Sequence, residues 1–522
     1  MNFSNYISIH SRNLPDKICL IERNPKKSIR RILSWEQFND KVNRVANFLR
    51  NEFKIDKGDH ILHLQNNSLE WLIAYYGIIR TGAIVVPLNF RFISKDIRYV
   101  ASVCEPVAFI LGSEFLKEVG PIMDELISVK NYAVAGTECP NGMRSFVELE
   151  EYQNGEEDIT PMAEMENLAL MFTSGTTGKP KPVVHTHCSI NAVAIGNAIS
   201  FSVQNDDNYI GLFPLYHAGT MFYMAAYLVV GATGTLLTEI KDPKWIIEAV
   251  AEEKGSDLML VVPVAISLIN AVKGGDIRLS DYDLSSWKIL EIGAQPVPYD
   301  IIRDLTNLLP CGIIVGYGLT QAGGGSTIML YPEDALSKPG SIGKPNFCVD
   351  CKLVDEGGKE VQPGQVGEVI IKTPRNMKEY YKNSELTAET VKNGWLYTGD
   401  LAKQDEGRFL YLVDRKKDLI ISGGENIYPV EIEDILHAHP KIEDAAVIGL
   451  QDKGLGEIAM AVIKTKKGEV MTEEEVIEYC KENIAIYKVP RKVVFDEVPR
   501  NPTGKIAKPS LRAKYCGKDK AF

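Results

Sequence analysis

The sequence lacks the apolar N-terminal run of a secretory signal, and it lacks an excess of positive charge. Its first residues, MNFSNYISIHSRNLPDK, contain no continuous apolar segment, so we expect no signal peptide. Among its 522 residues, 58 are Lys or Arg and 69 are Asp or Glu, which gives a net charge of −11. This balance argues against nucleic acid or an anionic membrane surface as the main partner.

Cysteine is too sparse for a disulfide framework, because nine residues are scattered along the chain. Without a secretory context they predict reduced thiols and a cytoplasmic location. Cys348 and Cys351 form a C-x-x-C pair with no second pair, in an alternating, strand-like segment, which disfavours a zinc or redox site. His185 and His187 have no carboxylate at ligand spacing, so we interpret them as a strand end and a helix start.

One stretch without charge, residues 218–237 (AGTMFYMAAYLVVGATGTLL), is long enough to span a bilayer. However, Gly231 and Gly234 divide it, and no cluster of Lys or Arg flanks it. We therefore predict a buried helix followed by a strand, and no transmembrane segment.

Strand and helix patterns alternate over the first three-quarters of the chain. Ser34 and Gln37 form a capping box that predicts a helix through Arg50. Apolar strand patterns recur at residues 61–65, 83–88, 108–112, 168–172, 258–262, 288–292 and 312–318. Strands separated by helices predict parallel, doubly wound sheets in an α/β protein too long for a single core.

The pattern changes twice near the C-terminus. From about residue 340 to 413, short alternating strands separated by Gly-rich turns predict a small antiparallel barrel or sheet. Beyond the charged DRKKD segment, two helix patterns and two strand patterns predict a small α+β domain. We expect a large domain of residues 1–415, made of two doubly wound subdomains and the barrel, and a second domain of residues 416–522.

The loop TSGTTGKPKP, residues 173–182, has the composition of a phosphate-binding loop. It is not a Walker A loop, because only Thr176 and Thr177 separate Gly175 from Gly178, and Pro180 replaces the magnesium-binding Ser or Thr. It nevertheless follows a predicted strand and offers backbone N–H groups, hydroxyls and lysines to a polyphosphate.

Further loops leave predicted strands at GAQPVP and GYGLTQAGGG, where parallel sheets bind ligands. With GWLYTGD, DRKKDLIISGGENIYPVEIE and NPTGKI, their order and spacing resemble the acyl-adenylate-forming superfamily, over nearly the whole chain. This group includes acyl-CoA synthetases, peptide-synthetase adenylation domains and luciferases. The resemblance implies a carboxylic acid joined to ATP, with release of pyrophosphate, and then transfer of the acyl group to a thiol.

The resemblance also implies a nucleotide site. The residues expected to bind the β- and γ-phosphates are Thr173, Ser174, Gly175, Thr176, Thr177, Gly178 and Lys179. The residues expected to line the adenine and acyl pockets are Gly293, Ala294, Gln295 and Pro296. Gly316, Tyr317 and Gly318 would flank the adenine, and Thr320 would reach the α-phosphate. Asp400 and Arg415 would hold the ribose. Lys505 matches the catalytic lysine, whose mobile ammonium group approaches the reacting oxygens, and Thr176 is assigned a catalytic role beside it.

His217 matches a position at the mouth of the acyl pocket, where it would gate the thiol channel, and a packed histidine is the alternative. We expect the remaining pocket wall from Ala218, Gly219, Gly293, Gly316, Ala322 and Gly323. The segment from Gln321 to Gly325 leaves space without a counter-charge, which favours an apolar fatty, alicyclic or aromatic acid. Gln321 stands where relatives carry a glutamate that binds magnesium, which puts strong metal binding at this position in doubt.

Lys417 matches a hinge about which the small domain turns between the two half-reactions. For coenzyme A we predict contacts from Ser422, Gly423, Gly424 and Glu425, with Lys488 and Arg491 near its nucleotide phosphates; a solvated basic patch is the alternative for the last two. The leading hypothesis is an acid–CoA ligase that uses ATP, Mg2+ and CoA, with a homodimer left open. A carrier-protein ligase and a non-catalytic nucleotide sensor remain alternatives.

Overall fold

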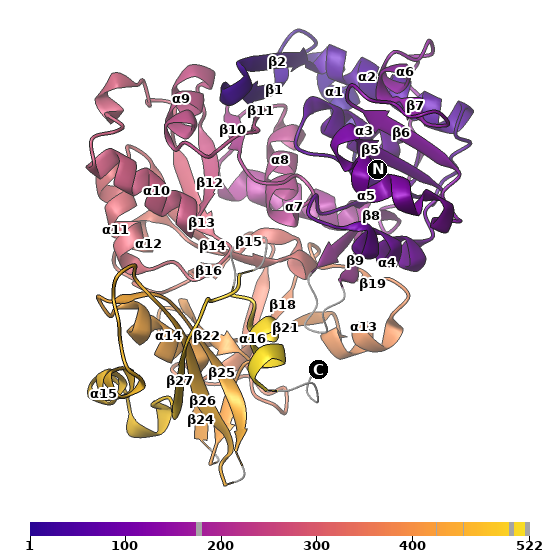
Figure 1. Cartoon of the computed structure of the whole chain (residues 1–522). Helices are drawn as coiled ribbons and strands as arrows, with labels where there is room; N and C mark the ends of the chain where they lie inside the picture. The colour runs from indigo at the N-terminus through magenta and orange to yellow at the C-terminus, as the bar shows by residue number, and fades with distance from the viewer. Residues whose placement is uncertain (174–179, 424, 453, 501–505, 517–522) are drawn as a thin grey trace.

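The structure is a computed structural model of the chain, and it describes residues 1–173, 180–423, 425–452, 454–500 and 506–516. Two large sheets form the body, and a smaller mixed α+β part lies below it in Figure 1. The predicted α/β class, with an antiparallel barrel-like part and a small α+β part, is confirmed.

The first sheet is parallel except where β9 and β19 join it. Alternate strand residues face two cores, as a doubly covered sheet requires: Ile61 and Ile110 pack toward α2 and α3, whereas Leu62 and Leu111 pack toward α4 and α5. Its strands, in spatial order, are β19 (Glu379–Tyr380), β9 (Lys181–Thr186), β8 (Asn167–Thr173), β4 (Ile84–Pro87), β3 (His60–Leu64), β5 (Ala108–Gly112), β6 (Asn131–Ala135) and β7 (Arg144–Ser145). Its helices include α2 (Trp35–Asn51), α3 (Leu69–Arg80), α4 (Ser94–Cys104), α5 (Leu116–Val119) and α6 (Phe146–Glu150).

The second sheet has parallel strands at its centre and antiparallel strands at both edges. One face packs on α9 (Lys244–Glu253), α10 (Val262–Lys273) and α11 (Tyr299–Leu308). The other face packs on α8 (Ala218–Val230). Its strands, in order, are β16 (Lys344–Pro345), β15 (Gly324–Leu330), β14 (Gly312–Leu319), β13 (Ile289–Gly293), β12 (Asp257–Val261), β10 (Asn208–Gly211), β11 (Thr233–Leu237), β1 (Ile18–Asn24) and β2 (Ile29–Ser34).

The uncharged stretch forms the buried helix α8 and the strand β11, as predicted. Gly231 ends α8 with φ 73°, a left-handed conformation that suits glycine. The helix packs against α7 (His187–Ser200) and shares a core with α1 (Asn5–Asn13), α2 and α3, so the two sheets are joined by apolar contacts. Within the described ranges, every helix is too short or too polar to cross a bilayer.

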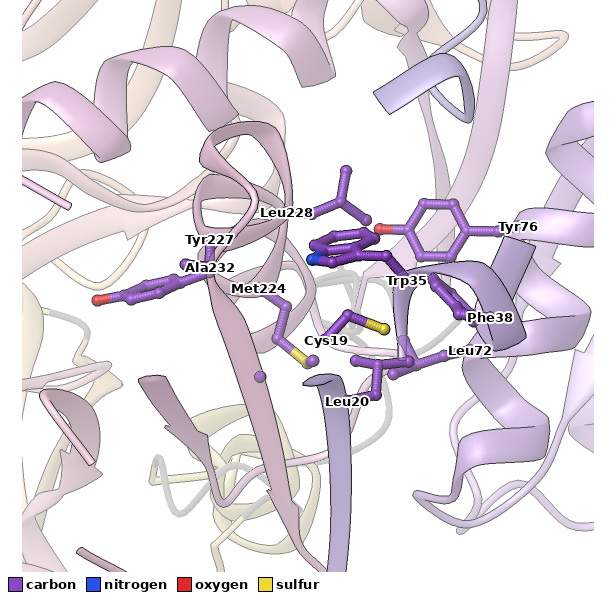
Figure 2. Close-up of a pocket in the computed structure, with 11 residues that line it drawn as sticks. Cys19, Leu20, Trp35, Phe38, Leu72, Tyr76, Met224, Tyr227, Leu228 and Ala232 are labelled. Atoms are coloured by element: carbon purple, nitrogen blue, oxygen red, sulfur yellow. The ribbon is translucent and has the colours of Figure 1, made fainter. Parts of the chain in front are cut away.

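A small apolar cavity lies at this junction (Figure 2). Trp35, Phe38 and Tyr76 line it from α2 and α3, and Met224 lines it from α8. The Tyr227 ring, which also belongs to α8, points away from Trp35 and Tyr76 in the close-up. Tyr227 also lines a second cavity, on the other side of this helix from Trp35 and Tyr76.

The segment predicted as a barrel forms an antiparallel sheet and also contributes strands elsewhere. Its own strands are β17 (Asp350–Val354), β18 (Gly367–Lys372), β20 (Val391–Lys392), β21 (Trp395–Gln404) and β22 (Leu410–Arg415). The short strands β16 and β19 leave this segment and pair with β15 and β9, so it is hydrogen-bonded to both large sheets. Short helices α12 (Pro332–Ala335) and α13 (Ser384–Thr390) flank these strands.

The last sheet contains only residues that follow Asp418. Its core is formed by apolar residues of the sheet and of two amphipathic helices. The strands are β23 (Ile420–Ser422), β24 (Glu425–Ile427), β25 (Ile442–Asp452), β26 (Gly456–Thr465) and β27 (Lys492–Phe495), and the helices are α14 (Pro429–His437), α15 (Glu473–Asn483) and α16 (Lys508–Tyr515).

Candidate active site

Two predicted nucleotide-binding loops meet at one edge of the second sheet. Gly293 at the end of β13 pairs with Gly316 on β14, and a Cβ atom on Gly293 would lie 2.4 Å from the Gly316 carbonyl oxygen. A Cβ atom on Gly318 would lie 1.9 Å from the Gly324 carbonyl oxygen. These backbones therefore touch without intervening side chains, which suits a flat ligand against the strand ends.

The loop after β13 begins with Ala294, a non-glycine residue with φ 68°. Such a left-handed residue is costly and is typical of functional loops. Gln295 is half-buried and Pro296 is exposed, so the loop surface is open to solvent beside Gly293.

The predicted phosphate loop joins β8 to β9. Thr173 ends β8, and its hydroxyl donates to the Lys181 carbonyl oxygen over 3.4 Å. Two antiparallel strands thus fix both ends of the loop. Ser174, Gly175, Thr176, Thr177, Gly178 and Lys179 lie outside the described residues, so their assignments stay predictions.

Tyr317, Asp400 and Arg415 come together although they lie far apart in the sequence. The Tyr317 hydroxyl donates to Asp400 Oδ2 over 2.7 Å, and Arg415 Nε lies 2.9 Å from Asp400 Oδ1. The Asp400 charge raises the pKa of Arg415, and burial together with Asp400 raises the pKa of Tyr317 well above its usual value. Each carboxylate oxygen keeps a further lone pair, so Asp400 is held rigidly and can still accept hydrogen bonds from a diol.

Thr320 and Gln321 lie in a short 3-10 helix, Thr320–Ala322, directly after β14. The buried His185 ring hydrogen-bonds through Nε2 to the Thr320 carbonyl oxygen over 2.8 Å, and burial lowers the pKa of His185 to about 4. A neutral His185 therefore supports this turn. His185 is the penultimate residue of β9, and His187 begins α7, as the sequence predicted to within one residue.

The Gln321 side chain is engaged with a neighbouring tyrosine. Its Nε2 atom donates to the Tyr380 hydroxyl over 2.9 Å. The main-chain carbonyl oxygen of Gln321 accepts from the Met377 N–H over 2.7 Å. Within the ranges the structure describes, no group of His, Cys, Asp or Glu side chains has the arrangement of a metal site. These donors do not fit a magnesium ion held by the protein alone.

The predicted acyl residues pack around the start of α8. His217 caps this helix, because its Nδ1 atom accepts from the Gly219 N–H over 3.2 Å. Ala218 and Gly219 are buried in the first turn, and a Cβ atom on Gly324 would lie 3.0 Å from the Ala218 carbonyl oxygen.

The glycines of the QAGGG segment allow close packing. Ala322 is fully buried, and Cβ atoms on Gly323 and Gly325 would lie 2.4 Å from Val193 and 3.1 Å from Tyr223. In the structure, side chains of α7 and α8 therefore fill much of the space that the sequence suggested around these positions.

Sequence reasoning missed an acidic side chain beside this cluster. Glu291 on β13 is 2% exposed, and its Oε1 atom lies 1.8 Å from the position that a Cβ on Gly316 would take. The Ser326 hydroxyl lies 2.9 and 3.0 Å from its two carboxyl oxygens, and the Tyr223 hydroxyl bonds in turn to Ser326. Burial raises the pKa of Glu291 to about 8, so the carboxyl is neutral at pH 7. Its one sequence signal was an acidic residue inside the apolar strand KILEI.

The predicted hinge is a turn between β22 and β23. Lys417 is exposed in this turn, and the neighbouring Asp418 binds Arg512 of α16 over 2.6 Å. The Val430 N–H, at the start of α14, donates to Asp414 Oδ2 over 3.0 Å. Burial raises the pKa of Asp414 to about 6, and the positive charge of Lys508 acts in the opposite direction.

The predicted CoA-binding residues fall in two neighbouring places. Ser422 and Glu425 pair across the β23–β24 hairpin, with Gly423 at φ 58° in its turn, and the 3-10 helix Ile486–Lys488 packs against β24. Lys488 forms an ion pair with Glu431, and Arg491 is exposed. Gly424 and Lys505 lie outside the described residues, so the structure does not place them.

Two family models cover most of the chain. The model described as AMP-binding enzyme matches residues 8–381, and the AMP-binding enzyme C-terminal domain matches residues 431–505. The chain belongs to the AMP-binding enzyme family.

Other AMP-binding enzymes match over nearly their whole length. The chain is 33% identical over 485 residues to a long-chain-fatty-acid–CoA ligase of Mycobacterium tuberculosis, covering 92% of this chain and 93% of the relative. A 2-succinylbenzoate–CoA ligase of Bacillus anthracis is 31% identical over 484 residues, with the same coverage.

Among solved structures, a Mycobacterium tuberculosis fatty acyl CoA synthetase has a TM-score of 0.78 at 30% identity, covering 99% of this chain and 98% of the other. The o-succinylbenzoate CoA synthetase of Bacillus subtilis, in complex with its acyl-adenylate, has a TM-score of 0.84 at 27% identity, covering 98% and 99%. The resemblance to the acyl-adenylate-forming superfamily is thereby confirmed for this AMP-binding enzyme.

Proposed function

We propose that the protein is an AMP-forming carboxylic acid–CoA ligase acting on a fatty or aromatic acid. The acid and ATP would give acyl-AMP and pyrophosphate, and CoA would then displace AMP to give the thioester. The observation that carries the proposal is that Tyr317 and Arg415 hold Asp400 in place. The chain belongs to the AMP-binding enzyme family, and relatives similar to it are named as CoA ligases.

The first half-reaction brings a carboxylate toward the α-phosphate, so the enzyme must position two anions and offset their repulsion. Asp400 would orient the ribose through its remaining lone pairs, and Arg415 would hold this carboxylate in position. Gly293, Gly316 and Gly318 would let the adenine lie against the backbone. Thr320, whose carbonyl group is fixed by His185, would reach the α-phosphate.

Residues outside the described part would supply the remaining charges. We propose that the loop from Thr173 to Lys179 holds the β- and γ-phosphates and that Thr176 and Lys505 assist the chemistry. Because Gln321 brings no negative charge, Mg2+ would enter bound to ATP, as part of that substrate. A related Bacillus subtilis synthetase has been solved with ATP and a magnesium ion.

The second half-reaction would use the small domain. We propose that residues 1–415 and 416–522 are the two moving parts and that the turn at Lys417 is the hinge. His217 would gate the thiol channel, while the Ser422–Glu425 hairpin, Lys488 and Arg491 would contact CoA. Lys488 can contact CoA only if its ion pair with Glu431 breaks, or if its ammonium group binds Glu431 and CoA together. We further propose that the enzyme is cytoplasmic. A homodimer stays a prediction, which a light-scattering measurement of the molar mass in solution would test.

The alternatives have less support. Transfer to a carrier protein would share the first half-reaction, but the similar relatives are named as CoA ligases. A non-catalytic sensor has only Gln321 in its favour, whereas the similar relatives are named as CoA ligases.

The deciding experiment measures AMP release over a panel of fatty and aromatic acids, with and without CoA. We expect acid-dependent AMP and the matching acyl-CoA, identified by mass spectrometry. Adenylate formation that transfers to a carrier protein and not to CoA would favour the first alternative. Absence of AMP with every acid, despite ATP binding, would favour a sensor.

A further inference from the structure

A second small cavity lies beside Glu291, between α8 and the second sheet. It has room for about one water-sized group. Its lining is mostly aromatic and aliphatic, with Leu258 and Ile289 beside three tyrosines, Tyr209, Tyr223 and Tyr227, and it includes the carboxyl groups of Asp257 and Glu291. The cavity in Figure 2 has no carboxyl group in its lining, whereas two carboxyl groups and three tyrosines border this one.

The strand register connects this cavity to the predicted acyl pocket. Glu291 and Gly293 lie on the same face of β13, because alternate strand residues share a face. Along that face toward the sheet interior, Asp257 of β12 pairs with Ile289, and Tyr209 of β10 pairs with Asp257. Glu291 therefore touches both the Gly316 edge and the cavity.

Two polar atoms at the cavity are buried without a hydrogen-bond partner. They are the Tyr209 hydroxyl and Asp257 Oδ1, and the two residues are 1% and 6% exposed. The Asp257 carboxyl is also hydrogen-bonded to Ser256 and interacts with the Tyr227 hydroxyl, so Tyr209 is the group without any partner in the described part of the chain. Leaving such groups unpaired is unfavourable, so a protein keeps them only where something compensates. A group that both donates and accepts would satisfy them together.

Glu291 adds a third unusual feature. Among the described side chains no Lys or Arg forms an ion pair with it, and its hydrogen bonds come from Ser326. A neutral carboxyl, a tyrosine hydroxyl and a serine hydroxyl each donate and accept. This set fits an uncharged hydroxyl group better than a second carboxylate, which would be buried with no cation.

We propose that this cavity is the distal subsite of the acyl pocket and that it recognises a hydroxyl group on the fatty or aromatic acid. The proposal rests on the CoA-ligase function proposed above. The acid would lie from the Gly293–Gly316 edge along the face of β13, which requires the Glu291 side chain to turn aside from Gly316. Its hydroxyl would donate to Asp257 and accept from Tyr209, with Glu291 beside it. The small size of the cavity would admit a hydroxyl and exclude bulkier end groups.

The test compares matched acids that differ by one hydroxyl group. Pairs such as benzoate with each hydroxybenzoate, and octanoate with 8-hydroxyoctanoate, are assayed for kcat/KM of CoA-dependent AMP release. We expect at least one hydroxy acid to exceed its unsubstituted partner about tenfold or more in kcat/KM, because the unsubstituted acid leaves the Tyr209 hydroxyl unpaired.

The most informative variant is Tyr209→Phe, which removes a hydroxyl that has no protein partner. We expect it to fold normally and to lower the hydroxy-to-unsubstituted ratio of kcat/KM about fivefold or more. Tyr132→Phe is the matched control, because Tyr132 on β6 also has a buried, unpartnered hydroxyl, in the first sheet. It should leave the ratio unchanged. Glu291→Leu should shift preference toward the unsubstituted acid.

Ratios near one for every pair in the wild type would overturn the proposal, and so would an unchanged ratio in Tyr209→Phe. In both cases acid-dependent acyl-CoA formation would still be observed, so the ligase function would stand. Failure of the ligase function would appear differently, as absence of AMP and thioester with all acids of either kind.

Discussion

Glu291→Gln should make the stability of the protein less sensitive to pH. The carboxyl is fully buried, and its pKa rises from 4.5 to about 8 because burial disfavours the charged form. Glutamine keeps the size of the side chain and hydrogen bonds to Ser326, but it has no proton to lose. The substitution therefore isolates the cost of burying an ionisable group.

The sign follows from proton binding. Between pH 4.5 and 8 the folded protein keeps the Glu291 proton, whereas the unfolded chain releases it, so wild-type stability falls as pH rises. Each pKa unit corresponds to about 1.36 kcal/mol, so from pH 5 to 7 this one residue costs the wild type about 2.7 kcal/mol. The variant lacks this pH dependence. Its free energy of unfolding relative to the wild type should therefore increase by about that amount between pH 5 and pH 7.

The assay is urea unfolding at pH 5, 6 and 7, followed by tryptophan fluorescence for both proteins. Glu253→Gln serves as control: burial acts to raise the pKa of Glu253, but hydrogen bonds from Arg30 and Arg23 outweigh it and hold that pKa below its usual value. Its folded and unfolded pKa values both lie below the tested range, so its loss of stability should be constant from pH 5 to 7. A constant difference for Glu291→Gln as well would refute the assignment of a buried, protonated carboxyl.

Three further predictions concern the half-reactions. Lys505→Ala should reduce ATP-dependent adenylate formation at least a hundredfold, the scale of about 3 kcal/mol of charge stabilisation, while thioester formation from supplied acyl-AMP largely survives; near-normal adenylation would exclude the catalytic role. Lys417→Pro should do the reverse, because proline fixes one torsion of the hinge: pyrophosphate exchange should persist while thioester formation collapses, and equal losses would indicate general damage. Gln321→Glu should lower the magnesium concentration for half-maximal adenylation if residue 321 faces the metal, since it adds a charged ligand. A lower maximal rate at saturating ATP would instead show that the new carboxylate repels the acyl carboxylate. If neither changes, Gln321 stays with Tyr380, outside the reacting centre.

Local signals in the sequence predicted the elements well. The capping box of Ser34 and Gln37 is present, and the helix it starts ends at Asn51, one residue beyond the prediction. The division of the uncharged stretch at Gly231 was also predictable, because a left-handed residue ends a helix wherever it occurs.

Contacts between distant residues were not predictable in this way. Glu291 meets Ser326, 35 residues later, and Ser326 meets Tyr223, 103 residues earlier. An acidic residue inside an apolar strand is visible in the sequence, but its neighbours depend on how β13, β15 and α8 pack. The same holds for β16 and β19, whose two residues each carry no periodic pattern and are defined by the strands they join.

The way β16 and β19 bind the large sheets has a consequence for recombining this protein with its relatives. A crossover near residue 340 would separate β16 from β15 and β19 from β9, so the incoming segment would have to match two foreign sheet edges at once. A crossover within residues 416–419 cuts no strand pairing in the part of the chain that the structure describes, because every ladder there lies wholly on one side of this turn. The donor piece must then chiefly reproduce the backbone N–H that reaches Asp414. The last sheet and its helices can therefore be exchanged as a unit, whereas the antiparallel segment before it cannot, because it is paired with both large sheets.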